Sequence, residues 1–383
     1  MTVTASRGFR AGGVAAGLKA SGRRDVALVV NDGPSDVAAA VFTTNRCKAN
    51  PVLWSEQVMA ARSAKAVVLN SGGANCYTGP YGFQTTRASA ELVAERIGVE
   101  ATDVVVCSTG LIGEQLHRGK LLAGIETVVR ELSDVGGPAA AEAIMTTDTR
   151  SKQVVRQGTG YTVGGMAKGA GMLAPALATM LVVLTTDADI DATTADRALR
   201  EATRVTFDRL DSDGCMSTND TVLLMCSGAS GTTPDADEFT ALLTDACHDL
   251  AQQLLGDAEG SEHDITIEVV NAATEDDALA VGRAIARSNL FKTAVYGKDP
   301  NWGRILAAVG TTEAAFEPGA LDVAFNGVWI CRGGEPGEPR DAVDLSDRAV
   351  TVTVDLKAGR ESATIWTNDL THAYVHENSA YST

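Results

Sequence analysis

Short apolar runs recur along the chain, and Gly, Asn and Asp separate them. Runs of this length, rich in Val, Ile and Leu, predict buried β-strands. Two later runs, Val350–Leu356 and Glu361–Trp366, alternate apolar with polar residues and predict strands that have one solvated face. The runs that predict buried strands are Asp25–Asn31, Ala38–Thr43, Ala66–Asn70, Asp103–Cys107, Met180–Leu184, Val222–Cys226 and Asp264–Asn271.

Apolar residues at helical spacing lie between these strands, so the pattern indicates an α/β fold with layered sheets flanked by helices. Two stretches rich in Gly, Gly8–Ser21 and Phe291–Gly310, are expected to be loops. The second holds Lys298, Asp299 and Arg304 between apolar flanks. The predicted helices are Ala88–Ile97, Leu122–Leu132, Ala139–Met145, Ala192–Val205, Phe239–Leu255 and Asp276–Arg287.

Composition narrows the class of protein. A chain of 383 residues with 45% hydrophobic and 21% charged residues is globular and long enough for two or three domains. Its net charge of −17 is spread along the chain, which argues against nucleic acid and anionic membranes as partners. Seven cysteines without a CxxC pair favour reduced thiols and a cytoplasmic protein. Five scattered histidines show no metal-binding spacing, and no apolar run reaches the length of a membrane span.

The stretch Gly164–Asp187 consists of three segments that differ in composition. A glycine-rich run that carries Lys168 is expected to be flexible, and its spacing does not match a phosphate-binding loop, so no cofactor is predicted. A hinge of small residues and one proline follows, and Thr179 then opens an apolar strand. In one interpretation the Thr179 hydroxyl satisfies a backbone group. In the other, the chain is cut between Ala178 and Thr179, and Thr179 becomes a nucleophile whose own α-amine is the base.

Other polar groups follow predicted strands and helices. Thr109 and Gly110 come directly after the strand Asp103–Cys107, where they can form either a helix cap or the donors of an oxyanion hole. Thr146 and Thr147 belong to a cluster of threonines at a helix end, which is typical of capping. Glu259 can be a solvated acid in a turn.

One segment, KGAGMLAPALATML, resembles the self-cleavage segment of the ornithine acetyltransferase family, also called glutamate N-acetyltransferases. The resemblance extends from about Gly8 to Thr383, and its other specific blocks are Ser108–Gly110, Ser217–Thr221 and Gly297–Arg304. The chain departs from the family pattern twice. Ala176-Leu177 replaces an Asn-Met pair, and Ser261-Glu262-His263 replaces Ala-Thr-Lys, so that a lysine expected beside a substrate carboxylate is missing.

The resemblance implies an acyltransferase of arginine biosynthesis that moves the acetyl group of N-acetylornithine to glutamate through an acetyl-threonine, without a cofactor. It implies a sandwich of the N-terminal-nucleophile type that is cut into chains 1–178 and 179–383, which assemble as an α2β2 heterotetramer. Residues 179–240 are expected to complete the N-terminal sandwich, and residues 241–383 to form a smaller α+β region. By resemblance, Thr179, Thr109 and Gly110 are catalytic. The substrate-binding residues implied are Thr146, Thr147, Lys168, Thr179, Glu259, Asn378 and Thr383.

Two alternatives remain open at this point. An N-terminal-nucleophile aminopeptidase or amidase would use the same threonine but pass the acyl group to water. A β-rich binding protein without enzymatic activity would not be cut. Whether acetyl-CoA also serves as acetyl donor is not decided by the sequence.

Overall fold

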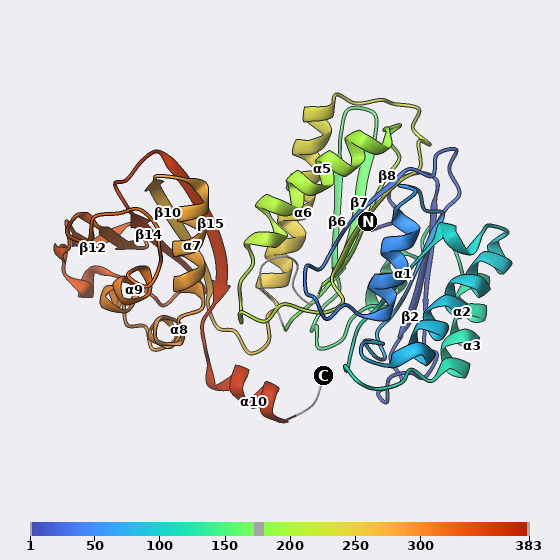
Figure 1. The fold of residues 1–383 in the computed structure, drawn as a ribbon, viewed down its shortest axis with the longest axis horizontal. Coiled ribbons are helices and arrows are strands. Elements are labelled where there is room, and N and C mark those ends of the chain that lie inside the picture. The colour runs from blue at the N-terminus through green and yellow to red at the C-terminus, as the bar shows by residue number, and fades with distance from the viewer. Residues whose placement is uncertain (1, 172–179, 381–383) are drawn as a thin grey trace.

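A computed structural model describes residues 2–171 and 180–380. The chain forms a large unit of two sheets enclosed by helices, and a smaller C-terminal unit of one sheet with helices, shown in orange and red in Figure 1. The helix α10 (His372–Ala380) extends from the small unit towards the large one (Figure 1). None of the helices in the described ranges is long and apolar enough to cross a membrane.

The large unit has four layers. One face of the first sheet packs against helices α2 and α3, and its other face packs against the second sheet. The outer face of the second sheet is covered by α5 and α6. The first sheet has the order β1 (Phe9–Val14), β2 (Val26–Asn31), β4 (Ala66–Asn70), β5 (Val104–Ser108). The second has the order β3 (Ala38–Phe42), β9 (Thr221–Cys226), β8 (Leu181–Thr186), β7 (Thr162–Lys168), β6 (Lys152–Gln157).

The sequence of each central strand explains these layers. In β8, Leu181 and Val183 enter the core between the two sheets, whereas Val182 and Leu184 enter the core under α5 and α6. Successive side chains of a strand point to opposite faces, so a continuous apolar run requires cover on both sides. The large unit meets this requirement by placing each sheet between another sheet and a layer of helices.

Helices of the large unit begin at recognisable caps. Asp191 accepts the backbone N–H groups of Thr193 and Thr194, and Asp235 caps α6 in the same way. The predicted helices are confirmed, with ends that shift by up to four residues, except that α2 begins at Gly79 and not at Ala88. The helix α1 was not predicted. The helices of this unit are α1 (Asn50–Met59), α2 (Gly79–Ile97), α3 (Arg118–Arg130), α4 (Gly137–Ala143), α5 (Ala192–Val205) and α6 (Ala236–Leu255).

The C-terminal unit has its own core, in which one face of a six-stranded sheet packs against helices. The two strands predicted from alternation are confirmed as β14 and β15, which flank β10. The sheet has the order β13 (Glu335–Pro336), β12 (Val328–Arg332), β11 (Asp322–Phe325), β14 (Ala349–Asp355), β10 (Asp264–Ala272), β15 (Glu361–Asn368). Its helices are α7 (Glu275–Ala286), α8 (Asn289–Tyr296) and α9 (Trp302–Val309).

Three stretches expected to be loops or flexible are regular structure. Gly8–Ser21 contains β1, and the run around Lys168 is β7. Glycine here serves close packing: a Cβ at Gly13 would lie 2.0 Å from Ala139 O, and one at Gly164 would lie 2.5 Å from Thr2 O. The stretch Phe291–Gly310 contains most of α8 and all of α9, because Ser288 and Asn301 cap the two helices.

The expected start of the C-terminal region at residue 241 falls inside α6. This helix packs against β6, β7 and α5 of the large unit, and Phe239 and Leu254 lie in the same core. A boundary after Leu255, before β10 begins at Asp264, fits this packing. Ala178 and Thr179, where the chain is expected to be cut, lie outside the described residues, so the division into two chains stays a prediction.

Candidate active site

Four strands of the large unit bring polar residues to one place between the two sheets. Thr109 follows β5, Lys168 ends β7, and Met180 and Asp220 precede the parallel strands β8 and β9. The side chains of Thr109, Lys168 and Asp220 are buried. The Lys168 Nζ donates to the Thr109 Oγ1 at 3.2 Å, and this hydrogen bond joins the second sheet to the first. The structure therefore brings together two of the predicted site residues that are 59 positions apart in the sequence.

The turn at Thr109 and Gly110 is held rigidly. Gly110 has a φ of +125°, and a Cβ there would lie 2.8 Å from Gly73 N. The Gly73 N–H donates to Thr109 O at 3.0 Å, and the Asn219 Nδ2 donates to Ser108 O at 2.7 Å. Only glycine adopts this conformation without strain. The turn is thus fixed before any ligand binds, which an oxyanion hole requires.

The side chain of Lys168 is buried, including its terminal amino group. Burial lowers the pKa of Lys168, and the charges of Asp148, Asp220 and Glu259 only partly offset this effect, which Lys152 reinforces. Because Lys168 donates to the Thr109 oxygen, the hydroxyl hydrogen of Thr109 points elsewhere. A hydroxyl that receives a hydrogen bond from a cation is a better donor to a third group.

The threonine cluster after α4 is fixed to β7 through Asp148. Its Oδ2 accepts the Thr146 N–H at 2.9 Å, and its Oδ1 accepts the Gly169 N–H at 2.7 Å and the Lys152 Nζ at 2.6 Å. Lys152 also contacts Asp257 Oδ2 at 2.6 Å. Burial alone would raise the pKa of Asp148, but the charges of Lys168 and Lys152 and these hydrogen bonds lower it to about 2. Asp148 therefore holds the backbone of Thr146 beside the end of β7.

Glu259 lies where the large unit meets α10. Its N–H donates to Ala170 O at 2.9 Å, and its carboxylate lies so close to Gly171 that a Cβ there would be 2.8 Å from Oε2. The Asn378 Nδ2 donates to Glu259 Oε2 at 3.0 Å. The helix α10 places Asn378 beside Glu259, although none of its residues is buried, so the docked tail that the sequence predicts is not confirmed. Thr383 lies outside the described residues.

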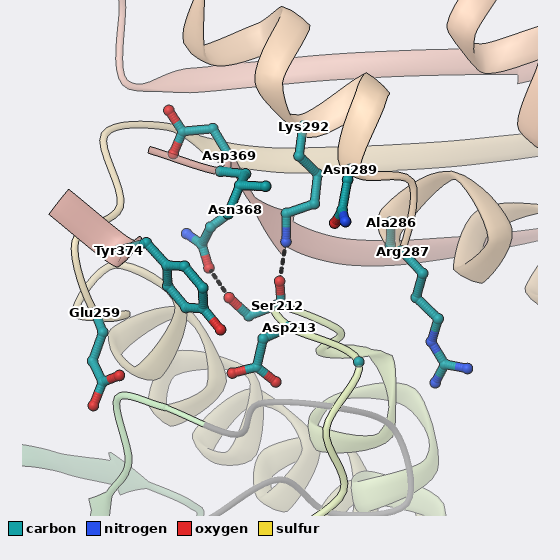
Figure 2. Close-up of a pocket in the computed structure, with 12 residues that line it drawn as sticks. Ser212, Asp213, Glu259, Ala286, Arg287, Asn289, Lys292, Asn368, Asp369 and Tyr374 are labelled. Carbon is teal, nitrogen blue, oxygen red and sulfur yellow. Dashed lines mark hydrogen bonds between the residues drawn. The ribbon is translucent and has the colours of Figure 1, made fainter. Parts of the chain in front are cut away.

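A cavity of about 170 Å³ opens between the two units, with Glu259 and Tyr374 on one wall and Lys292 on another (Figure 2). Lys292 is buried, and its Nζ donates to Ser212 O and approaches Thr367 Oγ1 at 3.5 Å. Burial lowers the pKa of Lys292, although Asp213, Asp211 and Asp369 oppose this shift. The cavity thus reaches the Glu259 carboxylate from the side of the C-terminal unit.

Comparisons with known proteins decide the family. The sequence model of the ArgJ family matches residues 10–383. The chain is 64% identical over 383 residues to the arginine biosynthesis bifunctional protein ArgJ of Thermobifida fusca, and the alignment covers both proteins completely. It is 63% identical over 382 residues to the protein of the same name from Streptomyces coelicolor, again with complete coverage of both. The chain belongs to the ArgJ family.

One solved structure similar to this ArgJ-family chain is that of ornithine acetyltransferase complexed with ornithine from Mycobacterium tuberculosis. The two sequences are 55% identical, and the match covers 47% of this chain and 96% of the other with a TM-score of 0.45.

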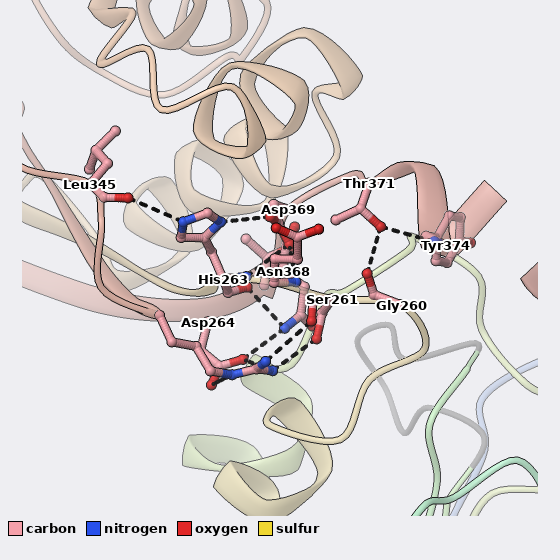
Figure 3. A network of polar contacts seen from close by, with 12 residues as sticks. Gly260, Ser261, His263, Asp264, Leu345, Asn368, Asp369, Thr371 and Tyr374 are labelled. Carbon is pink, nitrogen blue, oxygen red and sulfur yellow. Dashed lines mark hydrogen bonds and ion pairs between the residues drawn. The ribbon is translucent and has the colours of Figure 1, made fainter. Parts of the chain in front are cut away.

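His263, where the chain departs from the ArgJ-family pattern, does not line this cavity. The His263 Nδ1 lies 2.7 Å from Asp369 Oδ2, and its Nε2 lies 3.3 Å from Leu345 O (Figure 3). Asp369 Oδ1 also accepts the backbone N–H groups of Glu262 and His263 at 3.0 Å. His263 therefore ties the start of β10 to the end of β15 inside the C-terminal unit.

Sequence reasoning missed four buried charged residues of this site in the ArgJ-family chain: Asp148, Lys152, Asp220 and Lys292. Asp148 and Asp220 had a signal, because each lies inside a block of threonines or asparagines that adjoins a predicted strand or helix. Lys152 and Lys292 had none, since Lys152 also pairs with Asp257, 105 positions away, and Lys292 bonds to Ser212, 80 positions away. Within the described part of the chain, no group of His, Cys, Asp and Glu side chains is arranged to hold a metal ion.

Proposed function

We propose that this chain transfers the acetyl group of N-acetylornithine to glutamate and thereby produces ornithine and N-acetylglutamate. Membership of the ArgJ family over residues 10–383 supports this proposal. Relatives that align over their whole length carry the name arginine biosynthesis bifunctional protein. The observation that carries the proposal is the buried hydrogen bond from Lys168 Nζ to Thr109 Oγ1, beside a glycine turn of fixed geometry.

The proposed reaction has two steps. The chain first cuts itself between Ala178 and Thr179, and the Thr179 α-amine then removes the proton of its own hydroxyl. The Thr179 Oγ attacks the acetyl carbonyl, the C–N bond to ornithine breaks, and the protonated α-amine returns its proton to the leaving amine. The glutamate amine then attacks the acetyl ester, one of its protons passes through the Thr179 α-amine to the Thr179 Oγ, and the ester C–O bond breaks so that Thr179 leaves as an alcohol.

Each tetrahedral intermediate carries an oxyanion, which the Thr109 hydroxyl and the Gly110 turn stabilise. A donor polarised by Lys168 and fixed in advance stabilises this charge without reorganisation. Because Lys168 has more than one N–H group, it also provides a cation towards the substrate carboxylate.

Glu259 and Asn378 are the proposed recognition pair for an amino group of the substrate. A carboxylate at the end of the cavity accepts hydrogen bonds from an ammonium group, and Asn378 fixes its orientation. Thr146 and Thr147, held by Asp148, and the terminal Thr383 complete the proposed pocket. By the same proposal, chains 1–178 and 179–383 stay together as an α2β2 heterotetramer in the cytoplasm.

Incubation with N-acetylornithine alone tests the proposal. The chain that begins at Thr179 should gain one acetyl mass, and glutamate should remove that mass and yield N-acetylglutamate. Initial-velocity lines should be parallel, because ornithine leaves before glutamate binds. Free acetate without glutamate would indicate an amidase, and an uncut chain without transfer would contradict the proposal. The same experiment with acetyl-CoA decides whether it serves as a second donor.

A further inference from the structure

The cavity between the two units is lined by side chains of both charges. Lys292 in the first turn of α8 and Arg287 just before that helix lie on the wall that the C-terminal unit provides. Glu259 and Asp213 line the cavity from the other side (Figure 2). A cavity with basic groups on one side and acidic groups on the other can receive a chain that ends in either charge.

Lys292 presents an amino group to this cavity. Its side chain is buried, and it lines the cavity together with Ser212. The Lys292 Nζ donates to Ser212 O and lies 3.5 Å from Thr367 Oγ1, which is the limit of a hydrogen bond. These two contacts account for two of the three N–H groups of an ammonium group.

Two of the carboxylates around Lys292 have other close partners. Asp211 Oδ2 contacts Arg287 Nε at 2.8 Å, and Asp369 Oδ1 accepts two backbone N–H groups at 3.0 Å. Burial lowers the pKa of Lys292, and the charge of Asp213 and of these two carboxylates opposes the shift. A carboxylate of a ligand beside Nζ would favour the ammonium form in the same way. Arg287 is the weaker candidate for such a ligand, because it is already paired and its side chain is 49% exposed.

The proposed function brings opposite charges to one place. If both substrates react at the same acetyl-threonine, N-acetylornithine and glutamate present their α-nitrogens to the same carbon, so their side chains enter the same space. The side chain of ornithine ends in an ammonium group, and that of glutamate ends in a carboxylate. Glu259 attracts the first and repels the second. Binding of glutamate therefore calls for a cation in the same cavity.

We propose that Lys292 is a specificity-determining residue that binds the side-chain carboxylate of glutamate. This inference rests on the proposed function. Glu259 receives the side-chain ammonium group of N-acetylornithine in the first half of the reaction, and Lys292 receives the carboxylate of glutamate in the second half. The two substrates thus use different walls of one cavity, and neither requires Glu259 or Lys292 to change its charge.

The variant Lys292→Gln tests this role, because glutamine keeps an N–H donor for Ser212 O but carries no positive charge. With N-acetylornithine alone, the variant should still release ornithine at the natural rate. KM for glutamate should rise by about 10- to 100-fold, because a hydrogen bond to a charged partner is lost. KM for N-acetylornithine should change little.

Glutamine as acetyl acceptor separates recognition from a structural role. Its side chain has no charge, so Lys292→Gln should raise KM for glutamate much more than KM for glutamine. Lys298→Gln is the matched control, since Lys298 lies in the exposed break after α8 and does not line the cavity. It should leave both values in place. An unchanged KM for glutamate in Lys292→Gln, or an equal rise for both acceptors, would overturn the inference.

Glu259→Gln supplies the reciprocal test, and it decides the question if Lys292→Gln does not fold. KM for N-acetylornithine should rise by about 10- to 100-fold, whereas KM for glutamate should stay the same or fall, because a like charge is removed from the cavity. A rise of both values would mean that the two side chains are not bound in this way. Failure of the proposed function looks different, because the natural chain would then release no ornithine or form no N-acetylglutamate.

Discussion

Two buried carboxylates near Lys168 have opposite surroundings. Asp148 accepts hydrogen bonds from Lys152 and from the backbone of Thr146 and Gly169, and its pKa falls to about 2. Burial raises the pKa of Asp220 well above the ordinary value, and the hydrogen bonds from the Met180 N–H and the Ser217 hydroxyl only partly offset this rise. Both side chains are buried. Burial alone therefore does not set the pKa of a carboxyl group, because the nearby cations and hydrogen-bond donors can outweigh it.

The two regions therefore differ in how their charges are balanced. The Asp148 region holds the end of β7 and the threonine cluster in one geometry, and Asp148 is paired with Lys152. At Asp220, the Met180 N–H, the Ser217 hydroxyl and the charge of Lys168 do not offset the effect of burial.

The largest expected effect comes from Lys152→Met. This substitution leaves Asp148 and Asp257 buried without their shared cation, and breaking a buried pair in this way costs about 3–5 kcal/mol of unfolding free energy. Urea unfolding of the uncut Thr179→Ala chain, with and without Lys152→Met, measures this loss of unfolding free energy. Lys48→Met is the matched control, because Lys48 pairs with Glu56 in a half-exposed place, where a pair contributes about 0–1 kcal/mol. Equal losses in both variants would mean that the Asp148 region is not the rigid part of the site.

The next largest effect, on turnover, is expected from Thr109, whose hydroxyl accepts a hydrogen bond from Lys168. Thr109→Ala removes the proposed oxyanion donor, so kcat should fall by about 10²–10³-fold while KM for both substrates changes little. Thr109→Ser keeps the hydroxyl and should recover most of the turnover. Steady-state kinetics with N-acetylornithine and glutamate measure both variants. Unchanged turnover in Thr109→Ala would remove this residue from the mechanism.

The strands could be predicted because their signal is local. Runs such as Ala66–Asn70 and Val222–Cys226 are apolar on both faces, and this pattern requires a strand that is covered on both sides. The stretch Phe291–Gly310 was misjudged for a local reason as well. Gly297 and Pro300 lie in the short break between α8 and α9, Gly303 lies inside α9, and the caps Ser288 and Asn301 outweigh these residues.

The charge states of the site could not be predicted in this way. Lys152 and Asp257 are 105 positions apart, and Lys168 meets Thr109 over 59 positions. Nothing in the local sequence indicates which lysine is buried against which carboxylate. The sequence motif named Thr109, Lys168 and Glu259, but only the packing of the two sheets shows that the surroundings lower the pKa of Asp148 and raise that of Asp220.

The smallest expected effect is the pH dependence of stability, and the two carboxylates should give it opposite signs. The pKa of Asp148 in the folded chain, about 2, lies below the ordinary 3.8. Asp148 therefore stabilises the fold above about pH 4, by about 2 kcal/mol, and this contribution is lost as the pH falls from about 4 to 2. The pKa of Asp220 is raised, so Asp220 in the uncut chain lowers stability progressively as the pH rises above about 4. Urea midpoints of the uncut Thr179→Ala chain between about pH 2 and 8 measure both effects. Asp148→Asn should reduce the loss of stability below about pH 4, and Asp220→Asn should reduce the loss of stability above about pH 4. If both substitutions changed the profile in the same direction, the contrast between the two regions would be wrong.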